Sequence, residues 1–153
     1  MMASPSTLRF GTAGIPLSTP QPNTLTGIVH NRKLGLECME LEFVHGISVS
    51  EELAPQVRTT AQQHDITLTC HAPYFINLNA IEPKKRGASK HRIIEACRRL
   101  DQCGGWSACF HAGFYLGQEK ESVYLTIKKA IKEIVTALQN EVIKVWLSPE
   151  LTG

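Results

Sequence analysis

The chain of 153 residues contains 42% hydrophobic and 20% charged residues, which is the ordinary composition of a globular domain. No run approaches the roughly 18 consecutive apolar residues that a membrane span requires, and the first residues lack the apolar segment of a secretory signal. The formal net charge of +2 is too small by itself to indicate a nucleic-acid partner.

The N-terminal segment predicts a strand and then a helix. Residues 8–14 form a short apolar run broken by glycines, and the three prolines that follow it mark a loop. Apolar residues recur at helical spacing over residues 24–34, with Asn23 or Thr24 as the N-cap and Gly35 as the stop. These residues form the first predicted strand–helix unit.

The next segment repeats this pattern and begins a third strand. Residues 38–46 alternate apolar and polar side chains with the period of two that is typical of a strand. Ser50 caps a helical pattern over residues 51–64, whose first turn carries acidic side chains that the helix dipole favours. Residues 65–74 are rich in β-branched side chains and predict a strand that ends at Pro73.

The remaining chain predicts two more helices and two more strands. A helix at residues 87–102 stops at a pair of glycines, and residues 106–114 form the fourth strand. Residues 118–141 give the clearest amphipathic pattern, with an apolar stripe opposite several lysines. The fifth predicted strand covers residues 142–153.

This alternation predicts an α/β fold. Strands that alternate with helices are usually parallel and joined by right-handed crossovers. No glycine-rich dinucleotide motif and no P-loop motif occurs, so both nucleotide-binding interpretations lose their usual support. Two architectures remain open at this point. A small open α/β sheet suits the length, while a complete TIM barrel needs about 250 residues, so that the chain would be part of one.

Three residues with metal-binding side chains stand at the C-terminal ends of predicted strands. His71, His111 and Glu150 fall near the ends of the third, fourth and fifth strands. Active sites of parallel α/β proteins form at this edge of the sheet. Two imidazoles and a carboxylate suit zinc and leave one coordination position open. The pattern therefore indicates a zinc site, with polar residues that merely end strands as the alternative.

Several motifs carry a resemblance to a known family. CHAPYFINL (70–78), CFHAGFYLG (109–117) and LSPELTG (147–153) closely resemble three successive motifs of the endonuclease IV family of apurinic/apyrimidinic endonucleases. FGTAGIPLS near the start and LECMELEFVHG at the second strand are similar to the archaeal-type branch of that family. The resemblance covers essentially the whole chain and favours a TIM barrel of the xylose isomerase-like kind. The side chains then expected to fill the barrel are Phe10, Leu41 or Phe43, Phe110, and Val145 or Trp146.

The resemblance implies an enzyme, a zinc-dependent phosphodiester hydrolase that cleaves DNA 5′ to abasic sites in base excision repair. It also implies that His71 and His111 hold one zinc ion, while Glu150 bridges this ion to a second and serves as the catalytic residue. Clustered metal ions activate water and stabilise the leaving alkoxide. An abasic nucleotide is extruded from the duplex at low cost because its base is already missing. The expected partner is therefore DNA with abasic sites, with no role for a membrane.

The chain departs from the family pattern in two respects. The family's first strand commonly carries a histidine after its glycine, where this chain has Thr12. Most of the family's metal ligands belong to the second half of the barrel. We therefore expect residues 1–153 to be a single partial barrel domain, the N-terminal half with about four strand–helix units and a fifth strand, truncated there. The intact family holds up to three zinc ions. We expect one or fewer here, weak or absent activity, and a second chain that supplies the missing half-barrel.

The segment that follows the third strand contains five candidate residues for DNA binding. Tyr74 and Asn77 would line the entrance of the site, with simple packing as the alternative for Tyr74. Lys84, Lys85 and Arg86 are expected in a loop on the same rim, where the phosphates of bound DNA would run. The alternative for these three is the solvated outer face of a barrel helix.

Two other functions remain open. A sugar isomerase or epimerase of the same superfold would also use metal-bound carboxylate and histidine, and a non-catalytic remnant would fold poorly or need a partner. The five cysteines include no CxxC pair. We expect reduced, buried thiols in a cytoplasmic protein.

Overall fold

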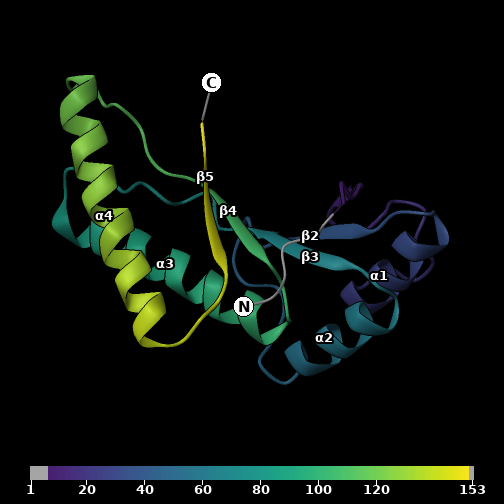
Figure 1. Cartoon of the computed structure of the whole chain (residues 1–153). Helices are drawn as coiled ribbons and strands as arrows, with labels where there is room; N and C mark the ends of the chain where they lie inside the picture. The colour runs from purple at the N-terminus through teal and green to yellow at the C-terminus, as the bar shows by residue number, and fades with distance from the viewer. Residues whose placement is uncertain (1–6, 152–153) are drawn as a thin grey trace.

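The computed structural model describes residues 7–151, which form a five-stranded sheet and four helices (Figure 1). In chain order the elements are β1 (Gly11–Ala13), α1 (Thr24–Lys33), β2 (Cys38–Glu42), α2 (Ala54–Gln63), β3 (Thr67–His71), α3 (Pro83–Gln102), β4 (Ser107–His111), α4 (Lys120–Asn140) and β5 (Trp146–Glu150). This alternation confirms the predicted α/β class. Within residues 7–151, none of the helices has both the length and the apolar composition to cross a membrane.

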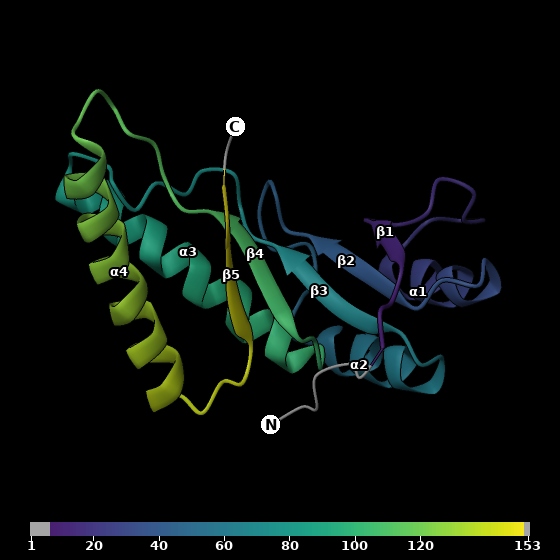
Figure 2. The same cartoon turned by 45° about the horizontal axis from the view of Figure 1, so that its top comes forward.

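The sheet is entirely parallel, and its strands lie in the order β1-β2-β3-β4-β5. Each crossover therefore leads to the next strand in the same direction. Because such crossovers are right-handed, the four helices lie on one face of the sheet (Figure 2). A doubly wound sheet reverses its strand order and carries helices on both faces. The observed order is that of consecutive strands in a TIM barrel.

The hydrophobic core lies between the sheet and the helices. Strand residues of one phase point into it, because successive side chains on a strand face opposite sides of the sheet. Those of β2, β3 and β4 are all at most 4% exposed: Met39, Leu41, Leu68, Cys70, Ala108 and Phe110. The helices contribute equally buried side chains to the same cluster, among them Ile28, Val57, Ile93 and Ile134.

The opposite face of the sheet is polar and partly exposed. It carries Glu40, Thr69, Cys109 and Ser148, and the hydroxyl of Ser148 lies 2.6 Å from that of Ser107 on β4. A closed barrel would enclose this face.

The expected apolar filling of the barrel is therefore wrong for the residues that are buried beside the helices. Leu41, Phe43 and Phe110 are buried, but in the core beside the helices, because they share the phase of Met39 and Ala108. Val145 belongs to this core as well, and Phe10 is 66% exposed. Trp146 is 59% exposed and shares the phase of Ser148, on the face that a closed barrel would enclose.

Several elements differ in extent from the prediction. The strands are shorter, because each gives way to a turn at one or both ends, and the last two residues of the predicted fifth strand lie outside the described residues. Helix α3 begins at Pro83 and not at Gly87. Proline fits a first helical turn because its φ is already helical and its missing N–H would have no partner there. Lys84, Lys85 and Arg86 thus lie in the first turn of α3 and not in a loop.

Side-chain hydrogen bonds occur at the start of α1 and in the turn before α2. Asn23 is the N-cap of α1, as predicted. Its Oδ1 accepts from the Thr26 N–H at 3.0 Å, and the Thr26 hydroxyl accepts from the Asn23 N–H at 3.0 Å. Helix α2 begins at Ala54, later than predicted, because a turn precedes it in which the Leu53 N–H donates to the Ser50 hydroxyl.

The glycine inside α3 offers a test of the helix. No atom lies within 4 Å of the position that a Cβ would take at Gly87. We expect Gly87→Ala to stabilise the protein by about 0.5–1 kcal/mol, because alanine restricts the unfolded backbone and suits a helix interior. Gly35 is the matched control, since its Cβ position is equally open but its φ is +76°. Gly35→Ala should destabilise the protein, because an L side chain is strained at positive φ. Urea unfolding measures both variants, and a less stable Gly87→Ala protein would contradict the helical assignment.

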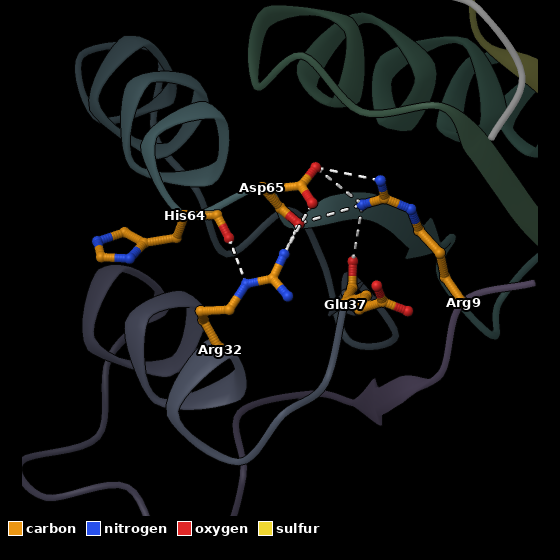
Figure 3. Close-up of polar contacts among 5 residues, drawn as sticks. All are labelled: Arg9, Arg32, Glu37, His64 and Asp65. Carbon is orange, nitrogen blue, oxygen red and sulfur yellow. Dashed lines mark hydrogen bonds and ion pairs between the residues drawn. The ribbon is translucent and has the colours of Figure 1, made fainter. Parts of the chain in front are cut away.

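At the edge of the sheet where the strands begin, Asp65 binds two arginines (Figure 3). Arg9, just before β1, donates from Nη1 and Nη2 to Oδ1 of Asp65, each at 3.1 Å. Arg32 of α1 donates from Nη2 to Oδ2 at 2.9 Å and from Nε to the His64 carbonyl at 2.7 Å. Asp65 itself has a φ of +49° in the turn between α2 and β3. The two ion pairs join the chain before β1, the last turn of α1 and this turn.

These contacts predict a pH dependence of stability. The hydrogen bond from Arg9 and the charges of both arginines lower the pKa of Asp65. Such a carboxyl stabilises the fold above its unfolded pKa of about 4, and this contribution is lost as the pH falls through the lower, folded pKa. We expect Asp65→Asn, which still tolerates positive φ, to be less stable than the wild type at neutral pH. The difference should shrink in urea unfolding as the pH falls below the unfolded pKa of about 4 and through the folded pKa. A difference that persists in acid would mean that charge is not the cause.

Candidate metal centre

The C-terminal ends of β3, β4 and β5 bring His71, His111 and Glu150 together. Each is the last residue of its strand, and His111 pairs with Glu150 in the register of β4 and β5. One ligand atom from each residue lies within 4.8 Å of the other two. The Oε2 atom of Glu150 is 3.6 Å from Nε2 of His71 and 3.9 Å from Nδ1 of His111. The three residues selected from the sequence thus form one cluster.

The ring of His71 is fixed by a hydrogen bond to the backbone. Its Nδ1 lies 2.8 Å from the Ala72 carbonyl oxygen. A carbonyl only accepts, so Nδ1 carries a proton and donates it, and Nε2 is the ring nitrogen that faces Glu150. Histidines that bind metals are commonly oriented in this way by a hydrogen bond from the other ring nitrogen.

The ring of His111 has a buried nitrogen that needs a partner. Its Nδ1 is buried and has no hydrogen-bond partner within residues 7–151. An unpaired buried polar atom costs about 1–3 kcal/mol, and a bound ion would offset that cost. Two ligands about 2.0 Å from a tetrahedral zinc ion lie roughly 3.3 Å apart. The observed separations of 3.6 and 3.9 Å are close to this value, so the three residues fit a metal ion.

Two more polar residues lie beside the cluster, and neither was predicted from the sequence. The Cys109 thiol donates to Oε2 of Glu150 at 3.4 Å. Burial, followed by the contact with Glu150, raises the pKa of Cys109 to about 11, so the thiol keeps its proton at neutral pH. Burial also raises the pKa of Glu40 on β2, an effect that the nearby His71 opposes. The period of two was the available signal, because it places Cys109 on the same face as His111.

Tyr74 covers the two histidines. Its ring stacks on His111, with centroids 5.9 Å apart and an interplanar angle of 23°, and meets His71 edge-on at 5.1 Å. The Tyr74 N–H donates to the Val44 carbonyl at 3.0 Å, and the neighbouring His45 ring lies edge-on at 6.4 Å. The Tyr74 side chain is nevertheless 52% exposed. It therefore both packs against the cluster and faces solvent at its entrance.

The other DNA-binding candidates lie around the start of α3. Asn77, Lys84 and Lys85 line one hollow of about 470 Å³. Lys85 also pairs with Glu82 at 2.5 Å, and the Asn77 side chain accepts from a backbone N–H two residues further on. Arg86 donates to two backbone carbonyls in the turn before the helix. The structure thus brings Asn77, Lys84 and Lys85 together. Arg86 does not line this hollow and instead fixes the turn before α3.

Comparison with known proteins identifies a family match and several similar structures. The sequence profile described as xylose isomerase-like TIM barrel matches residues 30–152. An uncharacterized protein of Methanocaldococcus jannaschii is 40% identical over 146 residues, which cover 95% of this chain and 52% of that protein. D-Psicose 3-epimerase of Clostridium cellulolyticum has a TM-score of 0.71 at 17% identity, over 87% of this chain and 48% of the epimerase. Endonuclease IV of Thermus thermophilus has a TM-score of 0.61 at 16% identity, over 84% of this chain and 48% of the nuclease.

These matches show the fold of the chain and do not identify its reaction. Further sugar epimerases are among the similar structures. The chain spans about half the length of the relative and of the solved structures that it matches. At such low identity, the solved structures show that the fold is shared and leave the substrate open.

Proposed function

This chain belongs to the xylose isomerase-like TIM barrel family, and we propose that it is a zinc-dependent endonuclease of the endonuclease IV type, acting 5′ to abasic sites in DNA. The observation that carries the proposal is the cluster of His71, His111 and Glu150 at the strand ends. Two of these residues lie in the motifs HAPYFINL and FHAG, which resemble those of endonuclease IV.

The side chains of the cluster suit phosphodiester hydrolysis. Nε2 of His71, Nδ1 of His111 and the Glu150 carboxylate would hold one zinc ion. When bound, zinc supplies Lewis-acid chemistry, which activates water at neutral pH and offsets negative charge on phosphoryl oxygens. The Glu150 carboxylate is half exposed and can also accept a proton from attacking water. Tyr74 lies exposed at the entrance of the site, and its aromatic face can stack against the sugar of the abasic nucleotide or against a neighbouring base.

The second candidate is a metal-dependent epimerase of ketose sugars. The observation that favours it is the TM-score of 0.71 with D-psicose 3-epimerase, against 0.61 with endonuclease IV. In addition, Glu40 places a second, half-buried carboxylate beside the cluster, and its raised pKa suits a group that exchanges a proton with carbon.

One pair of assays separates the two candidates. A duplex with a single abasic site and a panel of ketoses are each incubated with the zinc-loaded chain. We expect tighter binding of the abasic duplex than of the same duplex intact, and slow nicking 5′ to the abasic site. Glu150→Gln should remove the nicking and leave the fold unchanged. Epimerisation of a ketose without any preference for the abasic duplex would contradict the nuclease assignment.

The lysines at the start of α3 predict the salt dependence of DNA binding. Lys84 and Lys85 are exposed and line the same hollow as Asn77. We expect the double variant Lys84→Ala/Lys85→Ala to bind duplex more weakly and to flatten the slope of log K against log salt by about 2, since each phosphate contact contributes about 0.9. Lys33 and Lys144 lie toward the opposite edge of the sheet, so their double alanine variant removes the same charge as a control. Equal slopes for the two double variants would mean that the α3 lysines are only solvated.

We further propose that the protein resides in the cytoplasm. All five cysteines are free thiols, and three of them, Cys70, Cys97 and Cys103, are buried. Burial raises the pKa of Cys97 to about 12, so this thiol is unreactive at neutral pH. Unpaired thiols are typical of a reducing compartment.

A further inference from the structure

We propose that Cys109 is a positioning residue of the metal centre, whose thiol holds the ligating oxygen of Glu150 toward the two histidines. This inference rests on the metal site of the proposed function, and it holds for either candidate reaction.

Glu150 needs such a partner because of its place in the sheet. It is the last residue of β5, which pairs with β4 on one side and has no neighbouring strand on the other within residues 7–151. Its side chain is half exposed. Apart from the two histidines, the Cys109 thiol is the polar side chain of the described residues that contacts this carboxylate. A half-exposed glutamate would otherwise sample several rotamers, and the entropic cost of ordering its side chain would weaken metal binding.

The register of the strands places Cys109 at the centre of the cluster. Cys109 pairs with His71 of β3 on one side and with Ser148 of β5 on the other. It lies two residues before His111, so both side chains point to the polar face of the sheet. The sulfur therefore approaches Glu150 from β4, the strand that carries His111 and lies between β3 and β5.

A single carboxylate oxygen makes all three contacts. Oε2 of Glu150 is 3.4 Å from the Cys109 sulfur, 3.6 Å from Nε2 of His71 and 3.9 Å from Nδ1 of His111. The thiol donates to the oxygen that faces the histidines. This hydrogen bond therefore favours the carboxylate orientation in which Glu150, His71 and His111 can bind one metal ion together.

The geometry favours an orienting role over direct ligation. Ligand atoms of His71, His111 and Glu150 lie within 4.8 Å of one another, and the Cys109 sulfur is outside this group. A sulfur bound to zinc at about 2.3 Å would lie roughly 3.5 Å from every other ligand atom, whereas the Cys109 sulfur comes this close to Oε2 of Glu150 but not to both histidines. Groups that hydrogen-bond to metal ligands without touching the ion orient them and affect affinity strongly.

The test compares variants of the complete chain in zinc binding, measured by competition with a chromophoric chelator. We expect Cys109→Ala to bind zinc about 10-fold more weakly, at the lower end of the range for residues that orient ligands. Cys109→Ser keeps a hydroxyl donor and should restore an affinity close to that of the wild type. Cys38→Ala is the matched control. Cys38 is a partly exposed cysteine on β2 that faces the same side of the sheet as Cys109, and its replacement should leave zinc binding unchanged. Circular dichroism checks the fold, and Cys109→Val replaces the alanine variant if that variant is unfolded.

Cobalt substitution gives a second readout, which a merely structural role would not move. The Co²⁺-loaded wild type should lack the near-ultraviolet charge-transfer band of a thiolate ligand, and Cys109→Ser should give the same spectrum. A thiolate band that is present in the wild type and absent from Cys109→Ala and Cys109→Ser would overturn the orienting role in favour of direct ligation. Equal zinc affinities of Cys109→Ala and the wild type would overturn it outright. If the wild type binds zinc no better than a His111→Ala variant, the metal centre itself fails, and the role of Cys109 fails with it.

Discussion

Replacing His111 by alanine is expected to lower the affinity for zinc by at least about 100-fold, because it removes one of three ligands from a centre that has few. The wild type should retain about one zinc ion per chain or fewer after dialysis, since the described residues offer a single cluster of ligands. His71→Ala should have an effect of the same size. Chelator competition and metal analysis measure both quantities.

The control for this experiment is His45→Ala. His45 lies on the same rim, 6.4 Å from the Tyr74 ring, but outside the cluster of ligand atoms. Its replacement should leave zinc binding unchanged. A tightly held set of three zinc ions, or a His111→Ala protein that binds zinc like the wild type, would contradict the assignment.

The second large effect is expected on stability, from two adjacent residues of β3. Leu68 is 1% exposed in the core between sheet and helices, whereas Thr69 points to the partly exposed polar face. We expect Leu68→Ala to lower the free energy of unfolding by about 2–5 kcal/mol, because it leaves a cavity in the core. Thr69→Ala should cost less than about 1 kcal/mol. Urea unfolding measures the difference, and equal losses would mean that both faces of the sheet are equally covered.

The candidate cluster could be predicted from the sequence because its cause is local. A side chain at the end of a parallel strand lies at the edge where such proteins bind their ligands, and His71, His111 and Glu150 each fall there. The motifs around them strengthened the prediction. The alternation of strands and helices likewise gave the α/β class directly.

Other features depend on contacts that a single sequence does not reveal. Leu41 and Phe110 were predicted to fill a barrel, yet they face the helices, because period two separates two faces without saying which one is covered. The contact of Cys109 with Glu150 depends on the register of β4 and β5. Helix α3 was predicted to begin at Gly87, because Pro83 is also compatible with a loop. Glycine inside a helix costs only about 1 kcal/mol, which packing overrides.

The most direct test of the metal centre is the zinc K-edge absorption spectrum of the chain loaded with one zinc ion. The structure predicts scattering from two imidazole rings and from oxygen at about 2.0 Å, with no sulfur neighbour at about 2.3 Å. A sulfur shell, or fewer than two imidazoles, would contradict a centre formed by His71, His111 and Glu150.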